Sequence, residues 1–365
     1  MSMVESDERW MRLALRIATK GRGSTNPNPM VGAVIVSKDN RPVGNGYHAE
    51  VGGAHAEINA LDDAGQQAFG GTLYCTLEPC CHVGRTGPCV ERIVNSGINR
   101  VVIAMLDPNP KVNGGGVAYL KEHGVTVEIG VQMNEAERLN APFVTWIKRN
   151  RPFVTMKVAL SLDGCIADGH GERTTITSES SNAVVHSWRG EVDVIAVGSA
   201  TALVDDPLLT CRFVERRTPL TRVVFDRRLR IQPTAKIFTT LDTGPVIVFT
   251  TEQAFESKGR QVELLLDVGA RLEVVADGVS LGDALTLLGS WNLLNVLLEG
   301  GRIVHETAWA SGLVDHVKMF MGPMVCGRQG VRWLDRAVVL DRLVNMKVRG
   351  CGSDILVEGD VHRVD

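Results

Sequence analysis

Hydrophobic and polar positions alternate along the first 130 residues in a regular order of strand-like and helix-like segments. Short apolar runs at 30–37, 71–77 and 100–106 predict buried strands. Segments 54–65 and 89–97 carry apolar residues at helical spacing and end in glycine, which predicts helices. Further strands are expected at 41–48 and 125–130, and further helices at 8–21 and 117–124. The pattern is typical of a three-layer α/β sheet with short connections.

A second α/β pattern follows a predicted helix at 132–152, which is ended by Pro152 and which we interpret as a bridge. The expected domains are therefore residues 1–149 and 150–365. The pattern begins with the stretch 153–164, and strands are predicted at 193–198, 221–226, 245–250, 272–276 and 295–301, with a β-rich end at 315–323 and 353–359. The fold class expected for both halves is α/β.

Composition limits what the chain can act on. A length of 365 residues is typical of two domains, and 44% hydrophobic residues are sufficient for two sizeable cores. The net charge of −3 provides no broad basic field, which argues against nucleic acid as a partner. No apolar run approaches the roughly 20 residues of a membrane span, and the charged amino-terminal segment does not resemble a secretory signal. We therefore expect a cytoplasmic protein that acts on a small molecule.

The chain contains eight cysteines, and their distribution separates two groups. One group is clustered: Cys75, Cys80, Cys81 and Cys89. The other is scattered: Cys165, Cys211, Cys326 and Cys351. Without a secretory segment, reduced thiols are expected, and metal binding is the favoured use of a cluster. The scattered cysteines are expected to be small buried hydrophobic residues.

His55 and Glu57, followed by Pro79-Cys80, match the H-x-E and P-C pattern of zinc-dependent deaminases. Such chemistry needs a zinc ion with three protein ligands and an open position for water. It also needs a carboxylate outside the ligand set that carries a proton to the leaving amine, and Glu57 is the candidate. The second cysteine, Cys89, lies 89 − 80 = 9 positions after the first, so a loop is inserted between them.

The stretch EPCCHVGRTGPC at 78–89 resembles the bifunctional riboflavin-biosynthesis deaminase/reductase family, which reads E-P-C-x-H-x-G-[RK]-T-x-P-C. The resemblance implies a cytidine-deaminase-like domain with one zinc per chain, held by His55, Cys80 and Cys89. Cys81 stands where the family usually has serine, and Cys75 lies in the preceding predicted strand. We interpret both as non-ligands.

The same resemblance implies a set of residues that face the deaminase substrate: Asn28, His48, His82, Arg85, Asp107 and Asn109. A cation at Arg85 suits a ribose 5-phosphate. On sequence alone, however, a solvated loop charge is the favoured interpretation of either His82 or Arg85. Gly115 stands where the family commonly has arginine, which leaves one phosphate contact in doubt.

The second half resembles the reductase half of the same family through VALSLDG at 158–164 and LLEGG at 297–301. The resemblance implies a dihydrofolate-reductase-like fold that uses NADPH. By spacing alone, the glycine pair Gly300-Gly301 is compatible either with a phosphate at a helix amino terminus or with a close-packed turn.

The resemblance assigns two further sets of positions in this half. The positions that face the substrate are Lys157, Arg189, Asp205, Leu209, Arg212 and Glu299. The positions expected to bind the cofactor are Ala159, Thr175, Thr177, Thr201, Gly301 and Arg302. The chain departs from the family pattern at Arg173, Thr175, Arg302 and His305, which could alter cofactor affinity or weaken the reductase. Arg227 and Arg228 are candidates for a cofactor phosphate, and the choice between NADPH and NADH stays open.

The implied activity is deamination of 2,5-diamino-6-ribosylamino-4(3H)-pyrimidinone 5′-phosphate, followed by NADPH-dependent reduction of its ribosyl group to ribityl. The expected assembly is a homo-oligomer, a dimer or a tetramer. Two alternatives stay open at this point. One is a deaminase of another free or polymeric base with an inactive or redirected second domain. The other is a non-catalytic scaffold whose zinc is structural.

Overall fold

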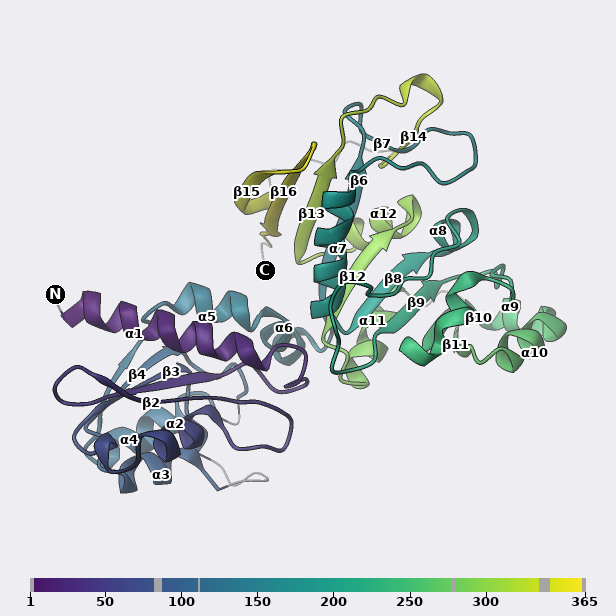
Figure 1. Cartoon of the computed structure of the whole chain (residues 1–365). Coiled ribbons are helices and arrows are strands. Elements are labelled where there is room, and N and C mark those ends of the chain that lie inside the picture. Colours follow the sequence, from purple (N-terminus) through teal and green to yellow (C-terminus); the bar gives the residue numbers. More distant parts are fainter. Residues whose placement is uncertain (1–2, 82–86, 111, 277–279, 335–341, 363–365) are drawn as a thin grey trace. The chain divides into compact units, whose positions relative to one another are not determined.

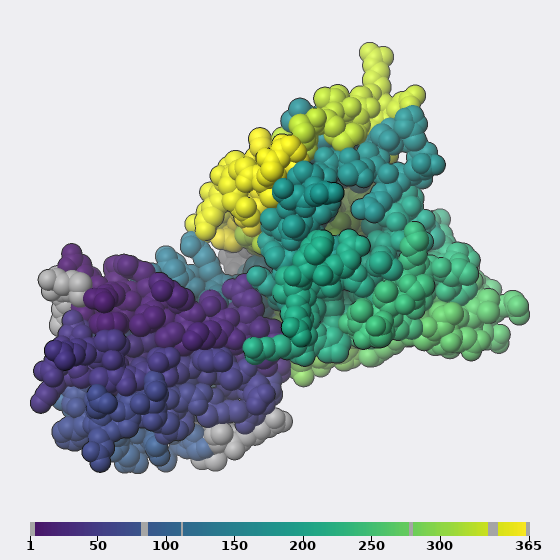
Figure 2. All heavy atoms as spheres, in the orientation of Figure 1, coloured from purple at the N-terminus to yellow at the C-terminus, as the bar shows by residue number. Residues whose placement is uncertain are grey.

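The chain folds as two compact units, Met1–Asn150 and Arg151–Asp365, and each is described here by itself. The structure is a computed structural model that describes residues 3–81, 87–110, 112–276, 280–334 and 342–362. In the space-filling view, the purple-to-blue residues of the first unit and the teal-to-yellow residues of the second each form a dense body (Figure 2). The boundary lies one residue beyond the expected one.

The first unit is a five-stranded sheet in the order β2-β1-β3-β4-β5, with helices on both faces (Figure 1). Its strands are β1 (Gly32–Val36), β2 (Pro42–Tyr47), β3 (Thr72–Leu77), β4 (Arg100–Met105) and β5 (Thr126–Ile129). Its helices are α1 (Met3–Ala18), α2 (Ala56–Ala64), α3 (Cys89–Asn95), α4 (Gly115–Glu122), α5 (Met133–Leu139) and α6 (Ala141–Arg149). The three-layer prediction is confirmed.

Strand β1 shows how both faces of this sheet are buried. All five of its residues are buried, because alternate side chains enter two different cores. Ala33 and Ile35 pack with residues of α2 and α3, whereas Val34 and Val36 pack with Trp10 and other residues of α1. A strand covered on both faces carries a continuous apolar run, which is the pattern seen in the sequence.

The prediction of one helix over 132–152 is wrong. Two helices, α5 and α6, occupy this segment and are separated at Asn140. The Asn140 side chain accepts a hydrogen bond from the Met30 backbone N–H (2.8 Å) and donates one to the Met30 carbonyl (3.0 Å). Pro142 then lies in the first turn of α6, where a missing N–H costs nothing. A tertiary contact therefore breaks the helix that the periodicity predicted.

The second unit is built on a nine-stranded sheet in the order β11-β10-β9-β8-β12-β6-β13-β16-β15. Seven strands from β11 to β13 run parallel, and β16 and β15 add an antiparallel edge. These strands are β6 (Phe153–Leu160), β8 (Val194–Gly198), β9 (Thr221–Phe225), β10 (Val246–Thr251), β11 (Arg271–Val275), β12 (Asn295–Gly300), β13 (His316–Met321), β15 (Leu343–Cys351) and β16 (Asp354–Val361). A separate two-stranded sheet pairs β7 (Cys165–Ala167) with β14 (Val331–Arg332).

Helices cover both faces of this larger sheet, and two core clusters lie between them and the strands. The helices are α7 (Glu179–Glu191), α8 (Ser199–Val204), α9 (Glu252–Ser257), α10 (Gly259–Asp267), α11 (Leu281–Ser290) and α12 (Arg302–Ala310). The 3-10 segments of the chain are η1 (Thr19–Gly21), η2 (Gly65–Ala68), η3 (Lys236–Thr243) and η4 (Gly327–Gln329). None of the helices in the described part of the chain has the length and apolar character needed to cross a membrane.

Candidate active sites

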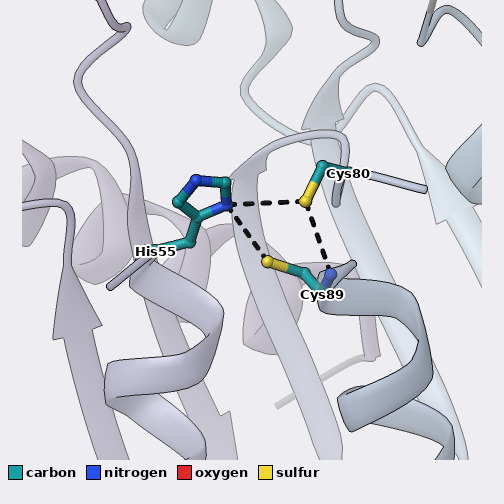
Figure 3. A group of neighbouring side chains, drawn as sticks. All are labelled: His55, Cys80 and Cys89. Carbon is teal, nitrogen blue, oxygen red and sulfur yellow. Dashed lines mark hydrogen bonds between the residues drawn. The ribbon is translucent and has the colours of Figure 1, made fainter. Parts of the chain in front are cut away.

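One imidazole nitrogen and two cysteine sulfur atoms meet at the edge of the first unit's sheet, where helices begin and a strand ends. His55 precedes α2 as its N-cap, Cys80 lies in the turn after β3, and Cys89 is the first residue of α3. The His55 Nδ1 atom is 3.2 Å from the Cys89 Sγ atom and 3.5 Å from the Cys80 Sγ atom. Figure 3 shows the three side chains pointing toward one another, with all three ligand atoms within 4.8 Å.

The donor geometry fits a zinc ion. With Zn–S near 2.3 Å and Zn–N near 2.0 Å, a tetrahedral centre places nitrogen and sulfur ligands about 3.6 Å apart. The two N···S distances here are 3.2 and 3.5 Å. The pKa of the Cys80 thiol is lowered because the Cys89 side chain and His55 hydrogen-bond to its sulfur. A thiolate is therefore already favoured, which is the form that binds metal.

Glu57 lies beside these ligands in the first turn of α2 and is only 3% exposed. Burial, together with the neighbouring Cys80 sulfur, raises the pKa of its carboxyl group to about 7. The Cys89 side chain hydrogen-bonds to this carboxyl group. Glu57 is not one of the three converging ligands, and its buried carboxyl group lies next to them.

Asn28 and His48 form a pair whose orientation can be deduced. The His48 Nδ1 atom lies 3.2 Å from the Ala54 carbonyl, which only accepts hydrogen bonds, so this nitrogen carries the proton. The His48 Nε2 atom then accepts from the Asn28 Nδ2 group at 3.1 Å. The Asn28 Oδ1 atom is thereby turned away from His48 and is available as an acceptor.

The loop that carries Asp107 and Asn109 is braced by a residue that sequence reasoning passed over. Glu78 is buried, and its carboxylate accepts hydrogen bonds from the backbone N–H groups of Asp107 (3.2 Å), Gly114 (3.0 Å) and Val117 (3.1 Å). The Asp107 carboxylate in turn accepts from the Asn109 N–H at 2.8 Å. Glu78 directly precedes Pro79-Cys80, so one short segment orders both the zinc turn and this loop. The sequence did contain a signal for this residue, because Glu78 is the first residue of the stretch EPCCHVGRTGPC.

Two departures from the family pattern lie in contact. A Cβ atom on Gly115 would be only 2.8 Å from the Cys81 Sγ atom, so the cysteine sulfur fills the space at this helix start. Cys81 and the buried Cys75 are not members of the converging set among the described residues. The predicted substrate residues His82 and Arg85 lie outside the described residues.

The second unit contains a cavity of about 1550 Å³ along the carboxyl ends of the parallel strands. All six positions predicted to bind the cofactor line it: Ala159, Thr175, Thr177, Thr201, Gly301 and Arg302. Lys157, Asp205 and Glu299, from the predicted substrate set, line it as well. Burial lowers the pKa of the Lys157 amine, and the nearby Glu299 carboxylate opposes that change. Arg227 and Arg228 belong to the same wall.

The other predicted substrate residues, Arg189, Leu209 and Arg212, are not among the residues that line the cavity. Arg189 forms a two-fold ion pair with Glu299, with contacts of 2.6 and 2.7 Å, and also donates to the Thr210 carbonyl. Arg212 lies against His186, a neighbour that sequence reasoning missed although it lies three residues before the predicted Arg189. Leu209 adopts a left-handed backbone conformation (φ 50°), a strained state that is frequent at functional sites.

Glycines allow β12 and the start of α12 to pack closely against the end of β8 and against α8. Gly301 has a φ of +98°, and a Cβ atom there would lie 3.3 Å from the Cα atom of Gly198. A Cβ on Gly300 would lie 3.0 Å from the Thr201 hydroxyl. Gly301 is also the N-cap of α12, so the first backbone N–H groups of this helix, which have no partner within the helix itself, point outward from its start. These features fit a dinucleotide with its phosphates at this helix terminus.

The departures in this half have different structural roles. Arg173, Thr175 and Arg302 all line the cavity, so each can change cofactor affinity. His305 is 2% exposed, and its Nδ1 atom accepts a hydrogen bond from the Trp333 indole N–H at 3.0 Å. Its Nε2 atom lies 3.2 Å from the Leu298 carbonyl, so the neutral imidazole is satisfied at both nitrogens. His305 therefore lines the cavity as well, but as a buried residue whose ring is held by Trp333 and Leu298.

The fold and the donors define a zinc-dependent deaminase joined to a nucleotide-cofactor reductase. Comparisons with known proteins agree. Residues 4–105 match the cytidine and deoxycytidylate deaminase zinc-binding region. Residues 152–357 match the RibD C-terminal domain.

Relatives match over nearly the whole chain. The riboflavin biosynthesis protein RibD of Aquifex aeolicus is 38% identical over 359 residues, covering 97% of this chain and 98% of its own. The protein of that name from Escherichia coli K12 is 36% identical, covering 88% and 89%. The solved structure of Acinetobacter baumannii RibD superposes with a TM-score of 0.84 at 33% identity, covering 99% and 100%. A Thermotoga maritima deaminase/reductase gives 0.84 at 35%, with the same coverage.

The chain belongs to the RibD family. It is an enzyme of riboflavin biosynthesis with a deaminase half that uses zinc and a reductase half that uses NADPH. The predicted fold class is confirmed for both halves, and nothing supports the alternative of another deaminase with an unrelated second domain.

Proposed function

We propose that the first unit deaminates 2,5-diamino-6-ribosylamino-4(3H)-pyrimidinone 5′-phosphate and that the second reduces the ribosyl group of the product to ribityl. The Thermotoga maritima relative is described as a diaminohydroxyphosphoribosylaminopyrimidine deaminase and 5-amino-6-(5-phosphoribosylamino)uracil reductase. Both halves of that protein have counterparts in this chain. The convergence of His55, Cys80 and Cys89 beside buried Glu57 is the observation that carries the proposal.

In the deaminase half, His55, Cys80 and Cys89 hold the zinc ion, which when bound supplies a water of lowered pKa. Glu57 accepts a proton from that water and delivers it to the amino group that leaves as ammonia. Asn28 presents its Oδ1 atom to N–H groups of the pyrimidine, an orientation supported by its contact with His48. The loop held by Glu78 provides Asp107 and Asn109 for the rest of the substrate.

In the reductase half, NADPH supplies the hydride when bound. The glycines at 300–301 and the start of α12 receive its phosphates, and Thr201 borders that position. Lys157, Asp205 and Glu299 then lie along the same cavity to orient the substrate. Arg189 holds Glu299 through two hydrogen bonds and so positions it. Arg227 and Arg228 are the cations we propose for the phosphate that distinguishes NADPH from NADH.

Replacing Glu57 with glutamine tests the deaminase assignment. Because the amide cannot carry the proton, ammonia release should fall by roughly 10²- to 10⁴-fold while the zinc content stays unchanged. NADPH oxidation on the already deaminated product should also be unchanged, because it takes place in the other unit. The exposed Glu50 gives the matched control, Glu50→Gln, which should behave as wild type. Ammonia release at the wild-type rate in Glu57→Gln would contradict the assignment.

We also propose a homo-oligomer and a cytoplasmic location. Strand β15 is the last strand of its sheet and exposes Val344, Met346 and Val348, so a second copy could pair along this edge. Light scattering during gel filtration should give at least twice the chain mass, and a charged substitution at Val348 should reduce it. A reducing compartment suits a centre that needs Cys80 and Cys89 as free thiolates.

A further inference from the structure

A second group of metal-binding side chains lies in the reductase half. Ligand atoms of Asp163, Cys165 and Cys326 are all within 4.8 Å of one another. Asp163 lies in the turn between β6 and β7, Cys165 begins β7, and Cys326 precedes η4. We had expected both cysteines to be isolated buried hydrophobic residues, but the fold brings them together. The group belongs to Arg151–Asp365, whereas the deaminase centre belongs to the other unit.

The backbone holds these residues in place before any ion is considered. The Asp163 carboxylate accepts hydrogen bonds from the Ser161 hydroxyl (2.6 Å) and from the backbone N–H groups of Cys326 (3.1 Å) and Gly327 (2.8 Å). The segment that carries Cys326 is therefore fixed to the turn that carries Cys165. On the other side, Cys165 pairs with Arg332 in the β7–β14 ladder.

A glycine leaves the space that the two sulfur-bearing side chains occupy. A Cβ atom on Gly330 would lie 2.6 Å from the Cys165 Sγ atom and 2.7 Å from the Cys326 Cβ atom. A Cβ atom essentially never lies within 3.0 Å of a non-bonded heavy atom. Any larger residue at position 330 would therefore displace Cys165 and Cys326. Because the φ of Gly330 is −59°, this glycine is not required by backbone conformation. Its role here is to give room.

We propose that Asp163, Cys165 and Cys326 bind a thiophilic divalent cation of the zinc(II) type. Two thiolates and one carboxylate form a donor set that zinc accepts, and a water can complete the tetrahedron. The hydrogen bonds from Ser161 and Gly327 orient the carboxylate, as outer partners of metal ligands usually do. Cys165 is buried, whereas Asp163 and Cys326 are partly exposed, so an ion can enter from solvent.

The position of this group indicates what the ion does. Strand β7 supplies Ile166 and Ala167 to the wall of the reductase cavity, and its partner β14 supplies Val331. Figure 1 shows β7 and β14 together beyond the end of β6. An ion held by Asp163, Cys165 and Cys326 would link the turn before β7 to the segment before β14. It acts as a structural clip for this wall, and the assignment does not depend on the proposed substrates.

Metal analysis of the whole chain, purified with zinc present and dialysed against buffer, tests the proposal. The wild type should hold two zinc ions per chain, and Cys165→Ser and Cys326→Ser should each hold one. Cys211→Ser, which changes a cysteine outside the group, should still hold two. Ammonia release should be unchanged in all three variants, because the deaminase ligands are intact. One zinc in the wild type, lost in His55→Ala, would overturn the proposal.

Cobalt(II) gives a second measurement that separates loss of binding from loss of folding. In Cys80→Ser/Cys89→Ser, which removes both thiolates of the deaminase centre, added cobalt should still produce the sulfur-to-metal absorption of a two-thiolate site, and the further change Cys326→Ser should weaken it at least twofold. The circular dichroism of both variants should remain that of the wild type. Peptide mapping without reductant provides the remaining outcome: a Cys165–Cys326 disulfide in the freshly isolated protein, with one zinc, would also overturn the metal assignment.

Discussion

The deaminase centre draws its three metal ligands and its proton carrier from residues 55 to 89, whereas the reductase cavity draws its wall from residues 157 to 331. In the first, the reactive atoms lie within a few ångströms and are held by two helix starts and one strand end. In the second, one to three residues from each of most of the parallel strands contribute to one large space. The two centres therefore differ in how locally their chemistry is encoded.

The difference follows from what each reaction needs. A metal ion is small and requires a few ligands at fixed distances, so a short motif with the right spacing can build the whole site. A dinucleotide and a sugar phosphate are long, and the parallel sheet binds them across several strand ends. Substitutions in the first centre should therefore act in an all-or-none manner, whereas those around the cavity should be graded.

The largest effect is expected for Cys80→Ser. Loss of a thiolate ligand should empty the deaminase centre and reduce ammonia release by at least ~10³-fold. Cys81→Ser, one residue further along, should keep both zinc and activity, because this sulfur only fills space beside Gly115. Zinc content and ammonia release measure both variants. If NADPH oxidation on the deaminated product also disappeared in Cys80→Ser, the independence of the two centres would be refuted.

The next effect concerns stability of the second unit below neutral pH. Burial lowers the pKa of His305 to about 4 from an ordinary value near 6.5. Between these two pH values His305 is protonated in the unfolded chain but neutral in the folded unit. The free energy of unfolding is therefore highest above pH 6.5 and declines toward pH 4. At pH 5 the cost should be about 2 kcal/mol.

Urea unfolding at pH 7 and pH 5 measures this effect. His305→Gln keeps an acceptor for Trp333 but cannot titrate, so its loss of stability between the two pH values should be smaller by about 2 kcal/mol. The exposed His123 provides the control, His123→Gln, which should follow the wild type. An unchanged pH dependence in His305→Gln would mean that His305 is already charged in the folded unit.

A smaller effect should separate two glycines of the second unit. Gly301→Ala places a Cβ atom 3.3 Å from Gly198 and at positive φ, in the wall of the cavity. The KM for NADPH should rise roughly tenfold, which corresponds to about 1.4 kcal/mol. Gly312→Ala also lies at positive φ (+63°), where an alanine is less strained than at the φ of +98° of Gly301, and it meets nothing within 4 Å. Steady-state kinetics should show no change in the KM for NADPH in Gly312→Ala. An equal rise of this KM in both variants would mean that Gly301→Ala acts only through backbone strain.

The smallest effect is expected for Glu78→Gln. One of the carboxylate oxygens becomes an NH₂ group that cannot accept the backbone N–H bonds of the 107–117 loop. The KM of the pyrimidine substrate should rise about fivefold, in line with roughly 1 kcal/mol for a weakened hydrogen bond. Zinc content should be unchanged, and Glu122→Gln on the exposed face of α4 serves as the control. A fall in zinc content would instead place Glu78 in support of the metal turn.

Sequence reasoning succeeded where the chemistry is local. The H-x-E pair and the two cysteines indicated the zinc centre, and the structure places their ligand atoms together. It failed where a distant contact decided the outcome. The helix predicted at 132–152 breaks because Asn140 hydrogen-bonds to Met30, more than a hundred residues away. His305 was interpreted as a change next to the cofactor glycines and it does line the cavity with them, but its hydrogen bond from Trp333 could not be read from the sequence.

By itself, the sequence determined the α/β class of both halves and the family, and it predicted many of the strands and the zinc ligands, because periodicity and short motifs are local properties. Only the tertiary structure decided that Arg189 holds Glu299, that Glu78 braces a loop and that Asp163, Cys165 and Cys326 meet. Each of these depends on which strand ends become neighbours in a sheet. That neighbourhood is set by packing of the whole chain, and no short window of residues contains it.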